Sequence, residues 1–445
     1  MTPDVLIVGA GPAGMAAAIA ARGQGLSVLL LDENPAPGGQ VFRALDRREA
    51  ADAQERQGKA LLAGFAACGA EVRHGAVLWA VEDGPRVFWS EHGAAQSATP
   101  GRLMLATGAT ERPLPIPGWT LPGVMGVGAA QIALKTSALV PDGQVWMAGQ
   151  GPLMWLYAVQ ALKKGGRIAG IIDLAPPGLV GRAMRHLPAV VRGADYIARG
   201  LLWQRSVKRA GVPVFSARDV AAEGRDRLEA VRFDGQRRPA DLLLLHDGVV
   251  PNTQVTRAIQ GCRHEWAEGS WRPVLDAWGN TSIPGVMVAG DSGGIGGAVA
   301  AALSGTLAAL DAARQLGRMT EHQRDALANP TRLARGRHLA IRPLLDALFP
   351  PRPFGAVADT TILCRCEEVS AGRVREAVAL GCLGANQVKA FCRAGMGACQ
   401  GRVCGPAVHG AIAAARGVAG DAVEPFRTRF PTKPLTLGEL AALHG

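Results

Sequence analysis

The chain has few aromatic residues and no long run of bulky apolar side chains. Phe, Trp and Tyr together make up 5% of it, and only two residues are tyrosine. An uncharged stretch at 293–310 has the length of a bilayer crossing, but it consists mostly of Gly, Ala and Ser. We therefore expect a buried helix there and no transmembrane segment. Abundant Gly and Ala suit the tight packing of an α/β protein.

Long basic runs are also missing, although the formal net charge is +11. No five or six basic residues follow one another, which favours an arginine-rich composition over nucleic-acid binding. The first residues, MTPDVLIVGAG, lack the basic and apolar regions of a signal peptide. We therefore expect a cytoplasmic protein, where the eight cysteines stay reduced and a disulfide is a poor explanation for them. Peripheral contact with the inner membrane face stays open.

What is present indicates a folded, multidomain chain. Its 445 residues are 48% hydrophobic, enough for two or three domains with their own cores. At the start, an apolar run leads into Gly9-x-Gly11-x-x-Gly14, and a second apolar run ends at Asp32. This order predicts a strand, a glycine turn, a helix and a second strand. In such a unit a pyrophosphate binds at the helix N-terminus, and the acid, Asp32, can bind a ribose hydroxyl.

FAD and NAD share this first loop, so later motifs must separate them. GGQ contains Gln40, ATG contains Thr107 and Gly108, and a third segment contains Gly290-Asp291 before a glycine-rich helix start. With these motifs in this order, the chain resembles the two-dinucleotide-binding flavoproteins, similar to glutathione reductase in fold. The resemblance implies that FAD is held by residues at these motifs, namely Gly9, Gly11, Gly14, Asp32, Gln40, Thr107, Gly108, Gly290 and Asp291, with Asp291 on the ribityl chain.

A second dinucleotide-like unit lies between these motifs. It has Gly149-x-Gly151, but Met154 stands where the third glycine belongs, and Asp173 ends the next predicted strand. The pattern predicts a Rossmann unit. Whether it holds NAD(P), ATP or no nucleotide stays open.

The predicted fold class is α/β, with two Rossmann-like domains and a small α-helical C-terminal domain. A buried strand followed by Pro251-Asn252 returns the chain to the first domain. The expected parts are a split FAD domain at 1–115 and 250–317, a second NAD-like domain at 116–249, a basic linker at 318–358, a small domain with two cysteine pairs at 359–418 and a tail at 419–445.

Four cysteines near the end form a C-x-C and a C-x4-C, and the residues are Cys364, Cys366, Cys399 and Cys404. Zinc sites favour C-x2-4-C pairs, so a C-x-C pair is less usual for zinc. Disulfide-reductase flavoproteins carry a C-x4-C at the position of residue 40, where this chain has no thiol. The two pairs resemble the [2Fe–2S] domain of bacterioferritin-associated ferredoxin, from whose usual C-x2-C the second pair departs. Zinc and purely structural thiols remain as alternatives. We expect Cys68, Cys262, Cys382 and Cys392 to be packing residues.

The segment RAGMGACQGRVCGP, with ATGATERPLPIPGWTLPGVM and VVPNTQ, resembles the A or alpha subunits of heteromeric amine-oxidising flavoproteins. This group includes opine oxidases, hydroxyproline dehydrogenases and hydrogen cyanide synthase. The resemblance implies an electron-transfer subunit that relays electrons from an FAD-containing catalytic beta subunit to a quinone or another carrier. It also leaves room for an FMN at the subunit interface.

No convincing catalytic group accompanies the cofactor motifs, so the catalytic residues stay unknown. His246 beside Asp247 is a candidate general base, but a packed histidine at a strand end is the stronger interpretation. Two other functions remain open: a self-sufficient NAD(P)H-dependent reductase, and a nucleotide-binding scaffold with a structural cluster. The sequence does not name the amine, the acceptor or the subunit stoichiometry.

Overall fold

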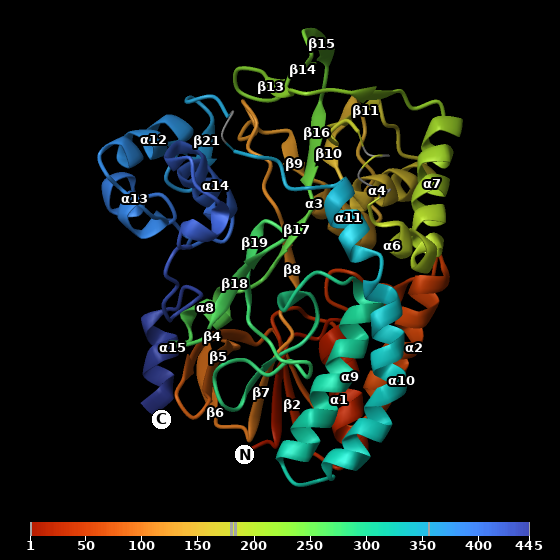
Figure 1. Cartoon of the computed structure of the whole chain (residues 1–445), viewed down its shortest axis with the longest axis vertical. Helices are drawn as coiled ribbons and strands as arrows, with labels where there is room; N and C mark the ends of the chain where they lie inside the picture. Colours follow the sequence, from red (N-terminus) through yellow and green to blue (C-terminus); the bar gives the residue numbers. More distant parts are fainter. Residues whose placement is uncertain (1, 179–180, 182–184, 355–356, 445) are drawn as a thin grey trace.

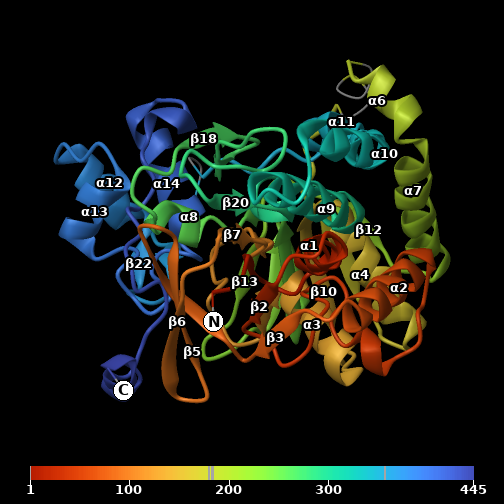
Figure 2. The ribbon, with the colours of Figure 1, turned by 90° about the horizontal axis from the view of Figure 1, so that it is seen from below.

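A computed structural model describes the chain except residues 1, 179–180, 182–184, 355–356 and 445. It has three parts: a first domain that contains the N-terminus, a second domain above it, and a C-terminal domain beside both (Figure 1). The C-terminal domain and helix α7 lie at opposite ends of the molecule's width, as the view from below also shows (Figure 2).

The first domain is built on a five-stranded parallel sheet. In spatial order its strands are β20 (Val286–Val288), β7 (Arg102–Leu105), β1 (Val5–Val8), β2 (Val28–Asp32) and β3 (Glu71–His74). Helices on one face are α1 (Pro12–Gly23), α2 (Ala53–Ala67) and α9 (Ala298–Gln315), with the 3-10 turns η1 (Leu45–Arg47) and η2 (Gly290–Ser292) at loops. The other face meets an antiparallel sheet of β4 (Val77–Glu82), β5 (Arg86–Glu91) and β6 (Ala94–Ala98).

Strand β1 shows why its sequence is apolar at every position. Val5 and Ile7 belong to the core under the helices, whereas Leu6 and Val8 belong to the core under the antiparallel sheet. Side chains alternate along a strand, so a sheet covered on both faces needs apolar residues throughout.

The second domain repeats this plan with a second five-stranded parallel sheet. Its strands are, in order, β12 (Val214–Ser216), β11 (Gly170–Asp173), β10 (Val145–Gln150), β16 (Leu242–Asp247) and β9 (Val124–Gly126). Its helices are α3 (Val127–Ser137), α4 (Pro152–Lys163), α6 (Leu187–Arg192) and α7 (Ala194–Arg209), and a small sheet adds β13 (Ala221–Glu223), β14 (Ala230–Phe233) and β15 (Gln236–Pro239).

The chain crosses between the two domains along one pair of antiparallel strands. It leaves through β8 (Ala109–Glu111) and returns through β17 (Val249–Pro251). After the return come α8 (Gln254–Ala258) and the hairpin of β18 (His264–Ala267) and β19 (Ser270–Pro273). The second domain is therefore inserted into the first.

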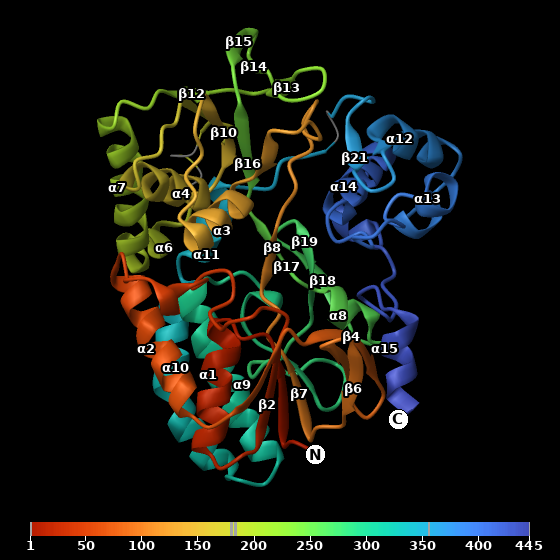
Figure 3. The same ribbon diagram turned by 180° about the vertical axis from the view of Figure 1, so that it is seen from behind.

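The arginine-rich segment after α9 forms two helices, α10 (Glu321–Leu339) and α11 (Arg342–Leu348). Helix α10 lies along α9 (Figure 3). Ala328 of α10 packs against Leu307 and Leu310 of α9. Helix α10 is therefore held to the surface of the first domain.

The C-terminal domain contains β21 (Ile362–Cys364), β22 (Val369–Ser370), α12 (Ala371–Ala379), α13 (Ala385–Cys392) and α14 (Gly405–Arg416) around its own core. The chain then runs through η3 (Gly420–Ala422) to α15 (Leu437–Ala441) and η4 (Ala442–His444). Leu435 and Leu443 pack against the antiparallel sheet of the first domain. Among the described residues, no helix is both long enough and apolar enough to span a bilayer.

Candidate cofactor sites

The glycine loop after β1 is shaped by two close backbone approaches. Gly9 has φ +105°, and a Cβ there would lie 2.5 Å from the carbonyl oxygen of Ala106. A Cβ on Gly14 would lie 1.8 Å from the oxygen of Gly9. Both positions therefore require glycine for the turn and for the packing of α1 on the sheet.

Gly11 differs from these two residues because the protein leaves space beside it. The nearest atom to a Cβ built there, at 4.0 Å, is Cα of Gly39 in the GGQ loop. Gly11 is also the N-cap of α1, whose first turn has no side-chain cap and no acidic residue. Free N–H groups and the helix dipole thus face an open position, which fits a dinucleotide pyrophosphate.

Asp32 ends β2 next to this loop and is 4% exposed. Its carboxylate accepts hydrogen bonds from the N–H of Ala10 and from the N–H of Asn34, the latter at 2.7 Å. The Asp32 carboxylate therefore already stabilises the glycine loop. Its remaining lone pairs would accept hydrogen bonds from a ribose.

Gln40 and Thr107 lie in loops that join separate elements. The side-chain oxygen of Gln40 accepts a hydrogen bond from Arg43 at 3.0 Å. The backbone carbonyl oxygen of Gln40 accepts one from Lys135 of α3 at 3.2 Å. Burial lowers the pKa of Lys135 to about 8. The hydroxyl of Thr107 donates to the carbonyl of Asn252 at 3.1 Å. The N–H of Asn252 in turn donates to the carbonyl of Gly108 at 3.0 Å, which ties the ATG loop to the returning chain.

Gly290 and Asp291 stand at the end of β20, before α9. Gly290 has φ +78°, and a Cβ there would be 2.7 Å from the Cβ of Ala13 on α1. Asp291 accepts hydrogen bonds from the N–H groups of Gly296 and Gly297, at 2.9 and 3.0 Å. Burial raises its pKa in spite of these bonds. The carboxylate thus fixes the glycine-rich start of α9, the position that the sequence assigned to the flavin.

The second domain reproduces the loop with different neighbours around its glycines. Met154 is fully buried in the core between α4 and the sheet, so it takes the place of the third glycine by filling that core. His246, 2% exposed, lies beside Gly151, and its Nδ1 is 2.6 Å from Oε1 of Glu111. The Glu111 carboxylate also accepts the N–H of Gly128 in the first turn of α3. His246 is therefore a packed histidine with a carboxylate partner.

The linker also reaches this second loop. The amide of Gln150, between the two glycines, donates to the carbonyl of Pro350 at 2.6 Å and to Asp247 at 2.8 Å. The N–H of Arg352 approaches the other oxygen of Asp247 at 3.3 Å. The amide nitrogen of Gln150 is thus satisfied by the chain itself, whereas its Oε1 is buried without a hydrogen-bond partner among the described residues.

The four C-terminal thiols lie in a row. Hydrogen bonds join Cys366 to Cys399, Cys399 to Cys404, and Cys404 to Cys364. The bond to Cys404 lowers the pKa of Cys364 to about 6 and that of Cys399 to about 4, whereas the same bonds raise the pKa of Cys404. In the described part of the chain, no three His, Cys, Asp or Glu side chains converge as they would on one metal ion. The four thiols supply the number of ligands that a binuclear cluster takes, two thiolates for each iron.

Backbone groups around the thiols add to this fit. The N–H of Gly395 donates to the sulfur of Cys364 at 3.5 Å, and the N–H of Gly401 donates to Cys399. Gly397 allows a close approach, because a Cβ there would be 2.2 Å from the Cβ of Cys366. Cys404 caps the start of α14, whose positive end faces the sulfurs. Such donors stabilise the negative charge of an iron–sulfur cluster.

The other cysteines pack as expected. Cys382 is buried in the C-terminal core, and Cys392 packs against the same core with its thiol donating to the carbonyl of Val388 at 3.2 Å. Cys68 and Cys262 pack against the two cores of the first domain.

The fold and the two cofactor regions define a class: FAD-dependent oxidoreductases that carry a C-terminal [2Fe–2S] domain. Residues 3–305 match the family described as pyridine nucleotide-disulphide oxidoreductase, and residues 362–414 match the BFD-like [2Fe-2S] binding domain. The chain belongs to this oxidoreductase family, and its C-terminal part is a domain of the second kind.

Particular relatives share the whole arrangement. The A subunit of opine oxidase from Rhizobium meliloti (strain 1021) is 41% identical, covering 99% of this chain and 98% of the relative. The HcnB subunit of hydrogen cyanide synthase from Pseudomonas aeruginosa is 31% identical, with 90% of each chain covered. The crystal structure of L-proline dehydrogenase from P. horikoshii shares the fold, with a TM-score of 0.74, 20% identity, and coverage of 99% of this chain and 79% of the other. The first two relatives are named as subunits of larger enzymes.

Proposed function

We propose that this chain is the electron-transfer subunit of a heteromeric dehydrogenase that oxidises a secondary amine or an amino acid, such as an opine or D-hydroxyproline. The observation that carries the proposal is the end-to-end similarity to the A subunit of opine oxidase, which includes both cofactor regions. The partner is an FAD-containing beta subunit, and the acceptor is a quinone or another carrier. We also place the chain in the cytoplasm, where its thiols stay reduced.

The side chains of the chain itself position cofactors. When bound, FAD exchanges electrons in pairs and the [2Fe–2S] cluster exchanges them singly. The adenosine and pyrophosphate end of FAD would be held by Gly9, Gly11, Gly14 and Asp32. The loops around the cofactor would be formed by Gln40, Thr107 and Gly108. The ribityl end would be held by Gly290 and Asp291. Cys364, Cys366, Cys399 and Cys404 would hold the irons. An FMN at the subunit interface is compatible with this role.

The second candidate function, a self-sufficient NAD(P)H-dependent reductase, has less support. Its nucleotide would need the loop at Gly149 and Gly151, where His246 and the linker carbonyl of Pro350 already lie. A structural scaffold has less support still, because the thiol row and its N–H donors suit a redox cluster.

The test is anaerobic mixing of amines or NADH with the isolated chain and with the co-purified complex, followed by visible absorbance. We expect an amine to reduce the flavin and cluster of this chain only when the partner is present. Cys399→Ser should slow acceptor reduction more than reduction of the partner's flavin, whereas Cys262→Ser, far from the thiol row in sequence, should change neither. Rapid flavin bleaching by an amine without the partner would overturn the proposal, and rapid bleaching by NADH would favour the reductase.

A further inference from the structure

Lys135 lies in the last turn of α3, in the second domain, but its ammonium group contacts the first domain. Nζ donates to the backbone carbonyl oxygen of Gln40 at 3.2 Å and to that of Val41 at 3.0 Å, 95 and 94 positions earlier in the chain. A lysine near a helix C-terminus can instead bond the last carbonyls of its own helix. Here both carbonyls belong to the other domain, so this side chain joins the two domains at one loop.

That loop, residues 38–42, forms one side of the open space beside Gly11. The N–H of Gly38 donates to the carbonyl oxygen of Ala10 at 2.8 Å, in the glycine loop itself. A Cβ built on Gly39 would lie 2.9 Å from Cα of Gly11, and Cα of Gly39 is the nearest atom, at 4.0 Å, to a Cβ built on Gly11. The position of the 38–42 loop therefore decides how wide the space for a diphosphate is.

Charged groups from the following segment and from the start of α2 face Lys135, and they are Arg43, Arg48, Asp52 and Glu55. Arg48 and Glu55 pair with each other at 2.6 Å. The hydrogen bonds of Lys135 and Arg43 in the described structure go to neutral carbonyl and amide oxygens. Burial and the neighbouring arginines lower the pKa of Lys135 to about 8, although the two carboxylates oppose this shift. Three cations thus outnumber two carboxylates, which favours an anion nearby.

We propose that Lys135 is a positioning residue for FAD: its ammonium group holds the 38–42 loop against the N-terminus of α1, where the loop forms one wall of the diphosphate site. The affinity for FAD then depends on a side chain of the second domain. By reciprocity, bound FAD strengthens the attachment of α3 to the loop. The inference rests on the assignment of FAD to the first glycine loop and is independent of the partner subunit.

The charge of Lys135 gives FAD binding a pH dependence of definite sign. The pKa of Lys135 is about 8 in the chain without FAD. A negative diphosphate nearby favours the ammonium form, so FAD binding raises this pKa. The affinity for FAD should therefore be full below about pH 7, fall as the pH rises above about 8, and level off above the pKa of the bound state. A side chain that only fills space would produce no such fall.

The experiment is titration of the FAD-free full chain with FAD, followed by flavin fluorescence, at about pH 7 and about pH 9.5. Lys135→Met should weaken FAD binding at the lower pH by about tenfold, as expected for loss of a charged hydrogen bond. Lys135→Arg should restore most of the affinity, because it keeps the charge and the donors. The unmodified chain should bind FAD about threefold or more weakly at the higher pH, whereas neither variant should show this fall, since neither loses a charge there.

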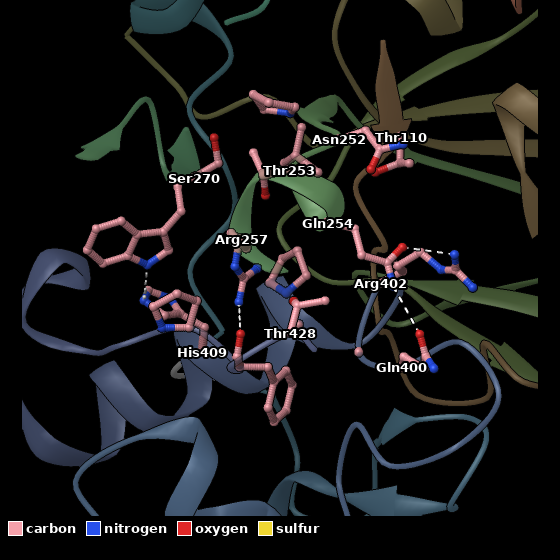
Figure 4. A pocket seen from close by; sticks show the side chains of 18 of the residues that line it. Thr110, Asn252, Thr253, Gln254, Arg257, Ser270, Gln400, Arg402, His409 and Thr428 are labelled. Carbon is pink, nitrogen blue, oxygen red and sulfur yellow. Dashed lines mark hydrogen bonds between the residues drawn. The ribbon is translucent and has the colours of Figure 1, made fainter. Parts of the chain in front are cut away.

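The matched control is Arg402→Met. Arg402 is another partly buried cation that joins two domains, because its guanidinium donates to Oε1 of Gln254 in α8 at 2.8 Å (Figure 4). It lies between Cys399 and Cys404 in the C-terminal domain and not at the 38–42 loop. Its replacement should leave the FAD affinity, and the fall of that affinity with pH, as they are in the unmodified chain.

Hydrogen exchange supplies a second measurement: FAD should slow exchange in α3 of the unmodified chain but not of Lys135→Met. If Lys135→Met fails to fold, the pH profiles of the unmodified chain and Lys135→Arg decide. The proposal is overturned if Lys135→Met binds FAD normally, if its affinity falls with pH as that of the unmodified chain does, or if Arg402→Met has the same effect. Normal FAD affinity in Gly11→Val would instead overturn the FAD assignment on which the inference rests.

Discussion

At the scale of single residues, the three glycines of the first loop have different tasks. Gly9 and Gly14 are needed by the fold, because a Cβ at either position would meet backbone atoms of the protein itself. Gly11 has ordinary helix-cap geometry, with φ −74°, and open space beside it. The sequence pattern predicted all three, but only the packing separates the two structural glycines from the one that faces a ligand.

We therefore predict that Gly11→Val folds but binds FAD poorly. The valine side chain would occupy the space proposed for the pyrophosphate, so FAD content should fall about tenfold or more, equivalent to about 1.4 kcal/mol or more of lost binding. Iron and sulfide content should be unchanged, because the thiols lie in another domain. Flavin extraction and iron analysis on the same sample measure both quantities.

Gly336→Val is the control for that substitution. Gly336 lies in α10, and no atom outside its own helix lies within 4 Å of a Cβ built there. It should retain normal FAD content. Full FAD occupancy in Gly11→Val would show that the pyrophosphate is not bound beside Gly11.

At the scale of elements, one buried carboxylate fixes α10 to α9. Asp311 is fully buried on α9 and accepts hydrogen bonds from Arg324 of α10 at 2.7 Å and from Arg314 at 2.8 Å. Burial alone would raise its pKa, but these bonds, with those from Asn280 and Gln315, outweigh it and hold the pKa near 2. The arginine-rich segment is thus attached through a specific ion pair, and many of its arginines are not free for a partner.

We predict that Asp311→Asn lowers the free energy of unfolding by about 3 kcal/mol, because it leaves Arg324 without its buried counter-charge. The folded pKa lies below the unfolded value near 3.8, so the stabilisation is present above pH 4 and is lost as the pH falls toward 2. Urea unfolding at pH 7 and at pH 3 measures both effects.

Asp325→Asn is the comparison for this prediction, since Asp325 pairs with the same arginine at 2.8 Å but is 45% exposed. Its loss should cost less than about 1 kcal/mol. Equal effects of the two substitutions would contradict the assigned role of Asp311.

The second Rossmann unit shows what sequence spacing can and cannot predict. The strand, turn and helix around Gly149 and Gly151 follow from local periodicity, as does the departure at Met154. The pairing of His246 with Glu111 does not, because it joins residues 135 positions apart on two strands. The contact of the linker with Gln150 spans 200 positions. Long-range contacts of this kind carry no local pattern, so the surroundings of the second loop were not predictable.

At the scale of the whole molecule, the C-terminal domain is held at several points. The indole of Trp119 in the second domain donates to the carbonyl of Ile362 at 2.6 Å, and His409 stacks on Trp266 of the first domain at 4.5 Å. Beyond the domain, the N–H of Thr432 donates to the carbonyl of Trp79 at 2.8 Å, and Lys433 pairs with Glu33 at 2.7 Å. Residues 432–443 therefore return to the first domain.

We predict that deletion of residues 432–445 leaves iron content unchanged but loosens the C-terminal domain. The core of that domain extends only to Phe426, so the cluster site stays intact. Hydrogen exchange in residues 359–378 should become faster, and electron transfer from flavin to cluster should slow. Lys433→Ala alone should change neither, because a single exposed ion pair contributes less than about 1 kcal/mol. Unchanged exchange and transfer rates in the deletion would contradict a holding role for the tail.

The return of the tail has a consequence for kinetics. Many redox domains are tethered at one end only, and their electron transfer waits for a diffusive search by the domain. Here the domain is anchored before its first strand by the linker and after its last helix by the tail. The separation between the flavin and the cluster is then set by the fold, so the transfer rate should not depend on solvent viscosity.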